Sequence, residues 1–143
     1  MILTDTHTHL YSEAFQEDRD QMIQRALDLG IKRFFIPAID STYNQAMFDL
    51  KKRYPENVYL MSGLHPTHVK ENYMEELEIV KRLLSEHSFV AIGEIGIDLY
   101  WDKSFLKQQQ YAFREQIKLA KQYHLPIVIH CRDAFDEVFE VLE

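Results

Sequence analysis

The feature that most constrains the fold of this chain is a regular alternation of short apolar runs with longer amphipathic segments. Each run is rich in β-branched, aliphatic or aromatic residues and is followed closely by loop-like sequence, which is typical of a buried strand. The runs occupy residues 2–4, 33–37, 58–62, 89–93 and 126–129.

Between and after these runs, apolar residues recur at intervals of three and four, which predicts amphipathic helices. Gly30 is placed to cap the first helix; Ser41 or Thr42 begins the second, and Pro55 ends it. The apolar faces are formed by Met22, Ile23, Ala26, Leu27 and Leu29; by Ala46, Met47 and Leu50; by Leu77, Val80 and Leu84; by apolar residues within 103–123; and by Phe135, Val138, Phe139 and Leu142.

Five strand–helix units in strict alternation predict an α/β fold with a parallel sheet and right-handed crossovers. The pattern alone leaves two architectures open, a doubly wound open sheet and part of a (β/α)8 TIM barrel. A complete barrel takes about 250 residues, so 143 residues hold only about the first five β/α units. Residues 137–143 carry no helix-ending signal, and no linker interrupts the chain. We therefore expect a single domain over residues 1–143, the N-terminal part of such a barrel.

Charge and composition narrow the possible partners. The net charge of -7, from 23 acidic and 16 basic residues, argues against a broad basic face for nucleic acid, although a bound metal can supply positive charge locally. No apolar run approaches the roughly 18 residues of a membrane span. The first residues lack signal-peptide features, and a single cysteine cannot form an internal disulfide. We expect a cytoplasmic protein with no membrane partner.

Three polar signals follow the first, fourth and fifth predicted strands. His7 and His9 are two residues apart, a spacing that places both imidazoles on one face of an extended chain. Glu94 follows the fourth run, and His130 follows the fifth. Each signal alone has a structural explanation: a polar strand end, a loop glutamate between glycines, or a hydrogen-bonded core histidine.

Taken together, the three signals favour a metal site. In a parallel barrel the carboxyl ends of the strands share one rim, so the four side chains can converge. Imidazole nitrogens and a carboxylate suit zinc, manganese or iron, and magnesium where carboxylate and water dominate. The combined pattern predicts a site for a divalent metal.

Four motifs in this order resemble the TatD family of metal-dependent deoxyribonucleases, within the wider group of metal-dependent barrel hydrolases. They are Asp-Thr-His-Thr-His-Leu at 5–10, Gly-Leu-His-Pro at 63–66, Gly-Glu-Ile-Gly-Ile-Asp at 93–98 and His-Cys-Arg at 130–132. The resemblance implies a (β/α)8 barrel with two divalent ions, which are Mg, Mn or Zn. It implies that His7 and His9 bind one ion, that His130 binds the other, and that Glu94 bridges them and activates water.

The resemblance also implies ligands that this chain does not contain. The family's remaining ligands, a histidine after strand six and an aspartate after strand eight, would lie beyond Glu143. Five units alone would expose two strand edges and part of an apolar interior, which favours association. We expect either a piece of a longer product or a barrel completed by other chains.

Two further residues are candidates for substrate binding. The resemblance of the Gly-x-His-Pro motif places His65 near the scissile phosphate; the alternative is a residue that merely completes a turn. Arg132 lies two residues past His130, so its guanidinium can face a substrate phosphate. The alternative for Arg132 is a surface salt bridge with Asp133 or Asp136.

The loop expected after the fourth strand holds Asp98, Tyr100 and Trp101. Its aromatic rings can stack on an unpaired base or simply cover the rim. A cysteine nucleophile at Cys131 is disfavoured, because the adjacent His130 faces the opposite side of the strand.

Metal-dependent hydrolysis of phosphodiester bonds at a DNA strand end, with a single strand as the expected partner, is the function that the pattern favours. Its 3′ to 5′ polarity is implied by the resemblance alone. Two alternatives stay open. One is hydrolysis of an ester or amide, such as deacylation of a D-aminoacyl-tRNA. The other is an inactive piece or interaction module that lacks the remaining ligands.

Overall fold

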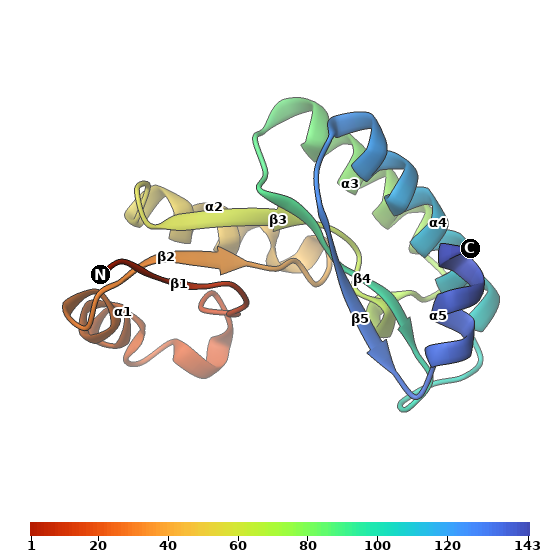
Figure 1. Ribbon diagram of the computed structural model, residues 1–143, viewed down its shortest axis with the longest axis horizontal. Coiled ribbons are helices and arrows are strands. Elements are labelled where there is room, and N and C mark those ends of the chain that lie inside the picture. Colours follow the sequence, from red (N-terminus) through yellow and green to blue (C-terminus); the bar gives the residue numbers. More distant parts are fainter.

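The computed structural model describes residues 1–143 and contains five parallel strands in sequential order, β1-β2-β3-β4-β5 (Figure 1). The strands are β1 (Leu3–Asp5), β2 (Ile31–Ile36), β3 (Val58–Ser62), β4 (Ala91–Asp98) and β5 (Ile127–Arg132). The sheet curls into a half-barrel, which confirms the prediction of the first five units of a (β/α)8 barrel.

Each strand is followed by an α-helix. The helices are α1 (Arg19–Asp28), α2 (Asn44–Arg53), α3 (Tyr73–Glu86), α4 (Leu106–Tyr123) and α5 (Phe135–Leu142), and short 3-10 turns span Glu13–Phe15, Ser41–Tyr43 and Pro66–His68. Figure 1 shows α1 and α2 beside β1 to β3, and the other three helices together beside β4 and β5. None of these helices combines the length and the hydropathy that a membrane-spanning helix requires.

Two apolar clusters join the helices to the sheet. One contains 15 buried residues, Phe113 among them, and joins α3, α4 and α5 to β4. The other contains 10 buried residues, Ile23 among them, and joins α1 and α2 to β2 and β3. Phe89, just before β4, packs against both clusters. Because both cores use the helix-facing side of the sheet, a polar residue such as Glu94 is left for the opposite, inner face.

An irregularity in β4 places that glutamate. Ile92, Ile95 and Ile97 all belong to the larger apolar cluster, although strict alternation would put Ile92 and Ile95 on opposite faces. The register with β5 shifts between Gly93 and Ile95, so Glu94 has no partner residue on β5. An extra residue of this kind is a β-bulge, which redirects a side chain. The bulge therefore turns Glu94 inward while the isoleucines stay in the core.

The fourth and fifth strands run further than the sequence predicted. β4 ends at Asp98 rather than at residue 93, and β5 ends at Arg132 rather than at residue 129. Glu94 and His130 therefore lie within strands and not after them. The glycines on either side of Glu94 and Ile95, Gly93 and Gly96, lie within β4 and not in a loop. They allow β4 and β5 to approach closely: a Cβ on Gly96 would lie 2.0 Å from the carbonyl oxygen of His130.

Smaller differences concern the helix boundaries. α4 begins at Leu106 rather than at residue 103, and α2 begins at Asn44, after a 3-10 turn whose N-cap is Asp40. The prediction that Leu29 belongs to an apolar helix face is wrong, because Leu29 lies past the last residue of α1 and is 78% exposed.

Candidate metal centre

Glu94 lies at the centre of a cluster of four histidines. Its Oε2 atom is 3.2 Å from His7 Nε2 and 3.1 Å from His9 Nε2. Its Oε1 atom is 3.5 Å from His130 Nδ1 and 3.7 Å from His65 Nε2. The structure thus brings together the four residues that the sequence singled out as ligands, and places His65 beside them.

The segment after β1 presents two of these histidines. The carboxylate of Asp5, the last residue of β1, accepts a hydrogen bond from the backbone N–H of His7 at 3.1 Å. The backbone N–H of Thr8 donates to the carbonyl oxygen of Phe35 in β2 at 3.1 Å. With the backbone held in this way, His7 and His9 reach the same carboxylate oxygen of Glu94.

Tyr11 determines the tautomer of His9, and therefore whether the nitrogen that faces Glu94 carries a lone pair or a hydrogen. The Tyr11 hydroxyl donates to the carbonyl oxygen of Pro37 at 2.7 Å, so it accepts a hydrogen bond from Nδ1–H of His9 at 2.9 Å. Neutral His9 then carries its lone pair on Nε2. Burial, and next the nearby charge of Glu94, raise the pKa of Tyr11, which keeps the hydroxyl protonated.

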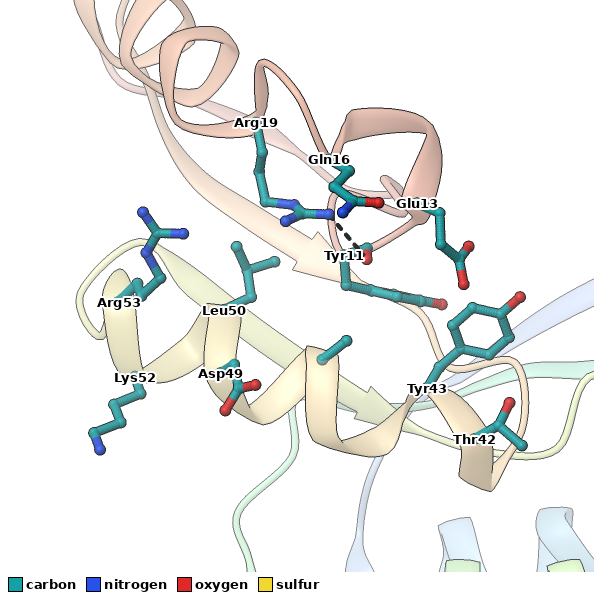
Figure 2. Close-up of a pocket in the computed structure, with 11 residues that line it drawn as sticks. Tyr11, Glu13, Gln16, Arg19, Thr42, Tyr43, Asp49, Leu50, Lys52 and Arg53 are labelled. Atoms are coloured by element: carbon teal, nitrogen blue, oxygen red, sulfur yellow. Dashed lines mark hydrogen bonds between the residues drawn. The ribbon is translucent and has the colours of Figure 1, made fainter.

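Arg19, the first residue of α1, holds the segment that carries Tyr11. Its Nε donates to the carbonyl oxygen of Leu10 at 2.7 Å, and its Nη2 donates to those of Tyr11 at 3.2 Å and Ser12 at 2.9 Å. Figure 2 shows Arg19 and Tyr11 lining one side of a pocket, with Tyr43 facing Tyr11. No sequence pattern could have predicted these contacts of Arg19, because the acceptors are backbone carbonyls.

Asp98 determines the tautomer of His130, as Tyr11 determines that of His9. His130 Nε2 lies 2.8 Å from Asp98 Oδ2, so the nitrogen carries the hydrogen and Nδ1 faces Glu94. Contact with Glu94 raises the pKa of His130; burial opposes this, and Asp98 adds to it. The loop position expected for Asp98 is wrong: it is the last residue of β4 and is buried. The alternation of residues 94, 96 and 98 along a strand was the signal that could have found it.

His65 has the opposite arrangement of hydrogens. Its Nδ1 accepts the backbone N–H of Thr67 at 3.2 Å and lies 2.7 Å from the Thr67 hydroxyl. Neutral His65 therefore carries its hydrogen on Nε2, the atom nearest Glu94. Burial lowers the pKa of His65 to about 4, so the ring is neutral at pH 7. His65 is thus a hydrogen-bond donor toward the cluster, whereas His9 and His130 offer lone pairs.

The donor set fits divalent metal ions. Burial acts to raise the pKa of Glu94, but the surrounding imidazoles, His130 first and His9 next, outweigh it and hold the pKa well below its usual value, so the carboxylate is ionised. The ligand atoms of His7, His9 and Glu94, and those of His65, Glu94 and His130, lie within 4.8 Å of one another in each group. Ligand atoms about 2.1 Å from one ion lie roughly 3.0–3.4 Å apart, close to the separations seen here.

The remaining predicted residues lie outside the cluster. Arg132 makes no salt bridge with Asp133 or Asp136, so that alternative is wrong; its guanidinium lies 3.7 Å from the centroid of the Tyr100 ring. Cys131 packs against the helix-side core, away from His130, as strand alternation predicted.

A curled parallel β/α sheet whose inner face carries histidines around one glutamate is the arrangement of the metal-dependent barrel hydrolases. Comparison with known proteins assigns the chain to one family within this class. The family model for TatD-related DNases matches residues 4–143, and the chain belongs to this family.

Individual relatives agree with the family model. The 3′-5′ ssDNA/RNA exonuclease TatD of Erwinia billingiae is 38% identical over 138 residues, which are 96% of this chain and 53% of that protein. The metal-dependent hydrolase YabD of Bacillus subtilis is 36% identical over 142 residues, 99% of this chain and 55% of that protein. The crystal structure of YjjV, a TatD homologue from Escherichia coli, matches with a TM-score of 0.87 at 32% identity, over 98% of this chain and 54% of that one. The chain thus spans about half the length of these proteins.

Proposed function

We propose that this chain supplies the first half of the active site of a divalent-metal-dependent hydrolase that removes nucleotides from the 3′ end of single-stranded DNA. The observation that carries the proposal is the ionised carboxylate of Glu94, shared among His7, His9 and His130. The relative from Erwinia billingiae, named as a 3′-5′ ssDNA/RNA exonuclease, supports the choice of nucleic acid as substrate.

By this proposal two ions, of Mg, Mn or Zn, occupy the cluster. His7 and His9 would hold one, His130 would hold the other, and Glu94 would be shared between them. Divalent ions bound in this way lower the pKa of a water ligand and neutralise charge on a phosphoryl oxygen. The remaining metal ligands would lie in the part of the barrel that corresponds to the other half of the relatives, either in the same polypeptide or in a partner chain.

The protein's own side chains have distinct roles in the proposed reaction. Glu94, ionised and buried, supplies the negative charge that would hold the ions, and with them the attacking water, in place. His65 donates its Nε2–H to a non-bridging phosphate oxygen, for which its neutral, largely buried ring is already oriented. Arg132 binds the phosphate with a guanidinium that no protein carboxylate engages.

Nuclease activity is tested with single-stranded DNA labelled at its 5′ end. We expect a ladder of progressively shorter products with added Mn²⁺ or Mg²⁺, none with a chelator, and none from the Glu94→Gln variant. Glu115→Gln, which alters a surface carboxylate paired with Lys118, is the matched control and keeps full activity. Full activity in Glu94→Gln would contradict the assignment of the site.

Two parallel measurements separate the alternatives. Faster metal-dependent hydrolysis of a D-aminoacyl-tRNA than of DNA would favour the deacylase. Mn²⁺ binding without any hydrolysis would show that the chain alone lacks the groups needed for turnover, whereas the absence of Mn²⁺ binding would contradict the metal site itself.

A further inference from the structure

A second constellation lies beyond the metal centre, where β4 and β5 end. Tyr100 and Trp101 follow β4 directly and are 51% and 71% exposed. Their rings meet edge to face, with centroids 4.8 Å apart. The guanidinium of Arg132, the last residue of β5, lies over both rings, 3.7 Å from the Tyr100 centroid and 5.6 Å from the Trp101 centroid. Two large aromatic side chains and a cation thus share one exposed surface.

The loop that carries these rings is anchored by the carboxylate that also orients the metal centre. Asp98 Oδ1 accepts hydrogen bonds from the backbone N–H groups of Tyr100 at 3.0 Å and Trp101 at 3.3 Å, while Oδ2 binds His130. The backbone N–H of Leu99 also donates to the carbonyl oxygen of Arg132 at 3.0 Å. The exposed rings therefore stand on a fixed backbone, in a constant relation to His130.

The cation of this surface has no partner within the protein. Arg132 is exposed, and its side chain makes neither a hydrogen bond to a protein acceptor nor a salt bridge, although 23 acidic residues give the chain a net charge of -7. Its contacts are with aromatic faces, which leaves the N–H groups of the guanidinium free for an external acceptor. A phosphate is the anion that such a fork binds with two parallel hydrogen bonds.

We propose that Trp101, Tyr100 and Arg132 form a subsite for one unpaired nucleobase and its phosphate, next to the metal centre. Trp101 stacks on the base, and Arg132, held over Tyr100, binds the adjoining phosphate. A base within a duplex cannot offer its face in this way, so the subsite selects single strands. The inference rests on the proposed nuclease function for its biological role, but the subsite itself needs no metal to bind.

The chain's single tryptophan makes a direct test possible, because Trp101 is the only residue of this type. In the presence of a chelator, we expect a single-stranded oligothymidylate to quench the fluorescence of the protein saturably. An oligonucleotide of equal length made of abasic sites should cause little quenching, as should a blunt duplex. Absence of quenching by the oligothymidylate, or equal quenching by the abasic strand, would overturn the proposal.

Variants measure the contribution of each side chain. We expect Trp101→Ala and Arg132→Ala each to weaken binding of a labelled oligothymidylate at least about fivefold. Arg132→Ala should also reduce the slope of log affinity against log salt concentration by about 1, because one phosphate contact is lost. Tyr111→Ala, which removes an exposed ring from α4, is the control and leaves binding unchanged. Wild-type affinity in Trp101→Ala would contradict the stacking role.

Failure of the subsite and failure of the nuclease proposal are distinguishable. Quenching by the oligothymidylate without either Mn²⁺ binding or hydrolysis would leave the subsite standing and remove the proposed function. Hydrolysis of single-stranded DNA without quenching would do the reverse.

Discussion

At the scale of single residues, each histidine has an inner ring nitrogen, which faces Glu94, and an outer one, which faces away from it. The hydrogen bond of the outer nitrogen determines whether the inner nitrogen carries a lone pair or a hydrogen. In His9 and His130 the outer nitrogen donates, to Tyr11 and Asp98, and the inner nitrogen presents a lone pair. In His65 the outer nitrogen accepts, and the inner one carries a hydrogen. Three imidazoles of identical chemistry are thereby divided into two that offer a lone pair when neutral and one that offers a hydrogen.

The role of Tyr11 is tested by Tyr11→Phe, which removes the acceptor of the His9 hydrogen and frees His9 to change tautomer. We expect affinity for Mn²⁺ or Zn²⁺ to fall by about 10- to 100-fold, as measured by isothermal titration calorimetry. Nitrogen-15 NMR of the wild-type protein in chelator, at a pH where the ring is neutral, should show the His9 hydrogen on Nδ1.

Tyr43→Phe is the matched control for this prediction. Tyr43 packs against Tyr11 with ring centroids 5.6 Å apart, but its hydroxyl makes no hydrogen bond within the protein (Figure 2). We expect its metal affinity to equal that of the wild type. Unchanged affinity in Tyr11→Phe, or a hydrogen on Nε2 of His9 in the wild type, would show that Tyr11 does not orient the ligand.

At the scale of secondary-structure elements, β4 contains a position, Gly96, whose backbone geometry tolerates only glycine. Gly96 has a φ of 145°, which side-chain-bearing residues rarely adopt, and an added Cβ would collide with the carbonyl oxygen of His130 at 2.0 Å. The colliding atom is backbone, so relief requires moving β5, and with it His130, away from Glu94.

We therefore expect Gly96→Ala to lower the free energy of unfolding by at least about 2 kcal/mol, as measured by urea denaturation in the presence of chelator. Gly30→Ala is a control for positive φ without a collision. Gly30 has a φ of 95°, but its Cβ would lie 3.4 Å from the nearest atom, the carbonyl oxygen of Met1. Its expected loss is about 1 kcal/mol. Equal losses in the two variants would contradict the role of close strand approach.

At the scale of the whole molecule, the half-barrel has two open sheet edges and one uncovered apolar helix face. β1 pairs only with β2, and β5 pairs only with β4 (Figure 1). On α5, Phe135 is 68% exposed, Phe139 57% and Leu142 43%, and these residues follow a helical spacing. Unpaired strand edges and contiguous exposed apolar groups both favour association.

We expect the 143-residue chain to self-associate as its concentration rises, as measured by analytical ultracentrifugation. Phe139→Glu should shift the distribution toward monomer, because it places a charge in the middle of the apolar face. Met74→Glu, at an exposed apolar residue of α3 away from this face, should not. A monomer at all concentrations in the wild type would show that the exposed groups are not sufficient for association.

The periodicity of the sequence was enough to predict a parallel α/β sheet and the convergence of the main cluster, while it left a doubly wound sheet and a barrel both open. Alternating strand and helix patterns require a parallel sheet, and the carboxyl ends of parallel strands meet on one side. Residues predicted to lie at the carboxyl ends of separate strands could therefore be expected together from the sequence, namely His7, His9, Glu94 and His130. The stacking alternative for Tyr100 and Trp101 came from the same placement and stays a prediction.

The orientation of these residues, by contrast, depends on tertiary packing. The bulge at Glu94, the extension of β4 to Asp98 and the contact of Tyr11 with His9 each depend on the register or packing of segments far apart in the sequence. Local patterns carry no information on such registers: glycines in β4 have the same composition signature as a turn, and a tyrosine after two histidines has the same signature as a core residue. Side-chain identity set the chemistry that is available, and strand register and packing set which atoms present it.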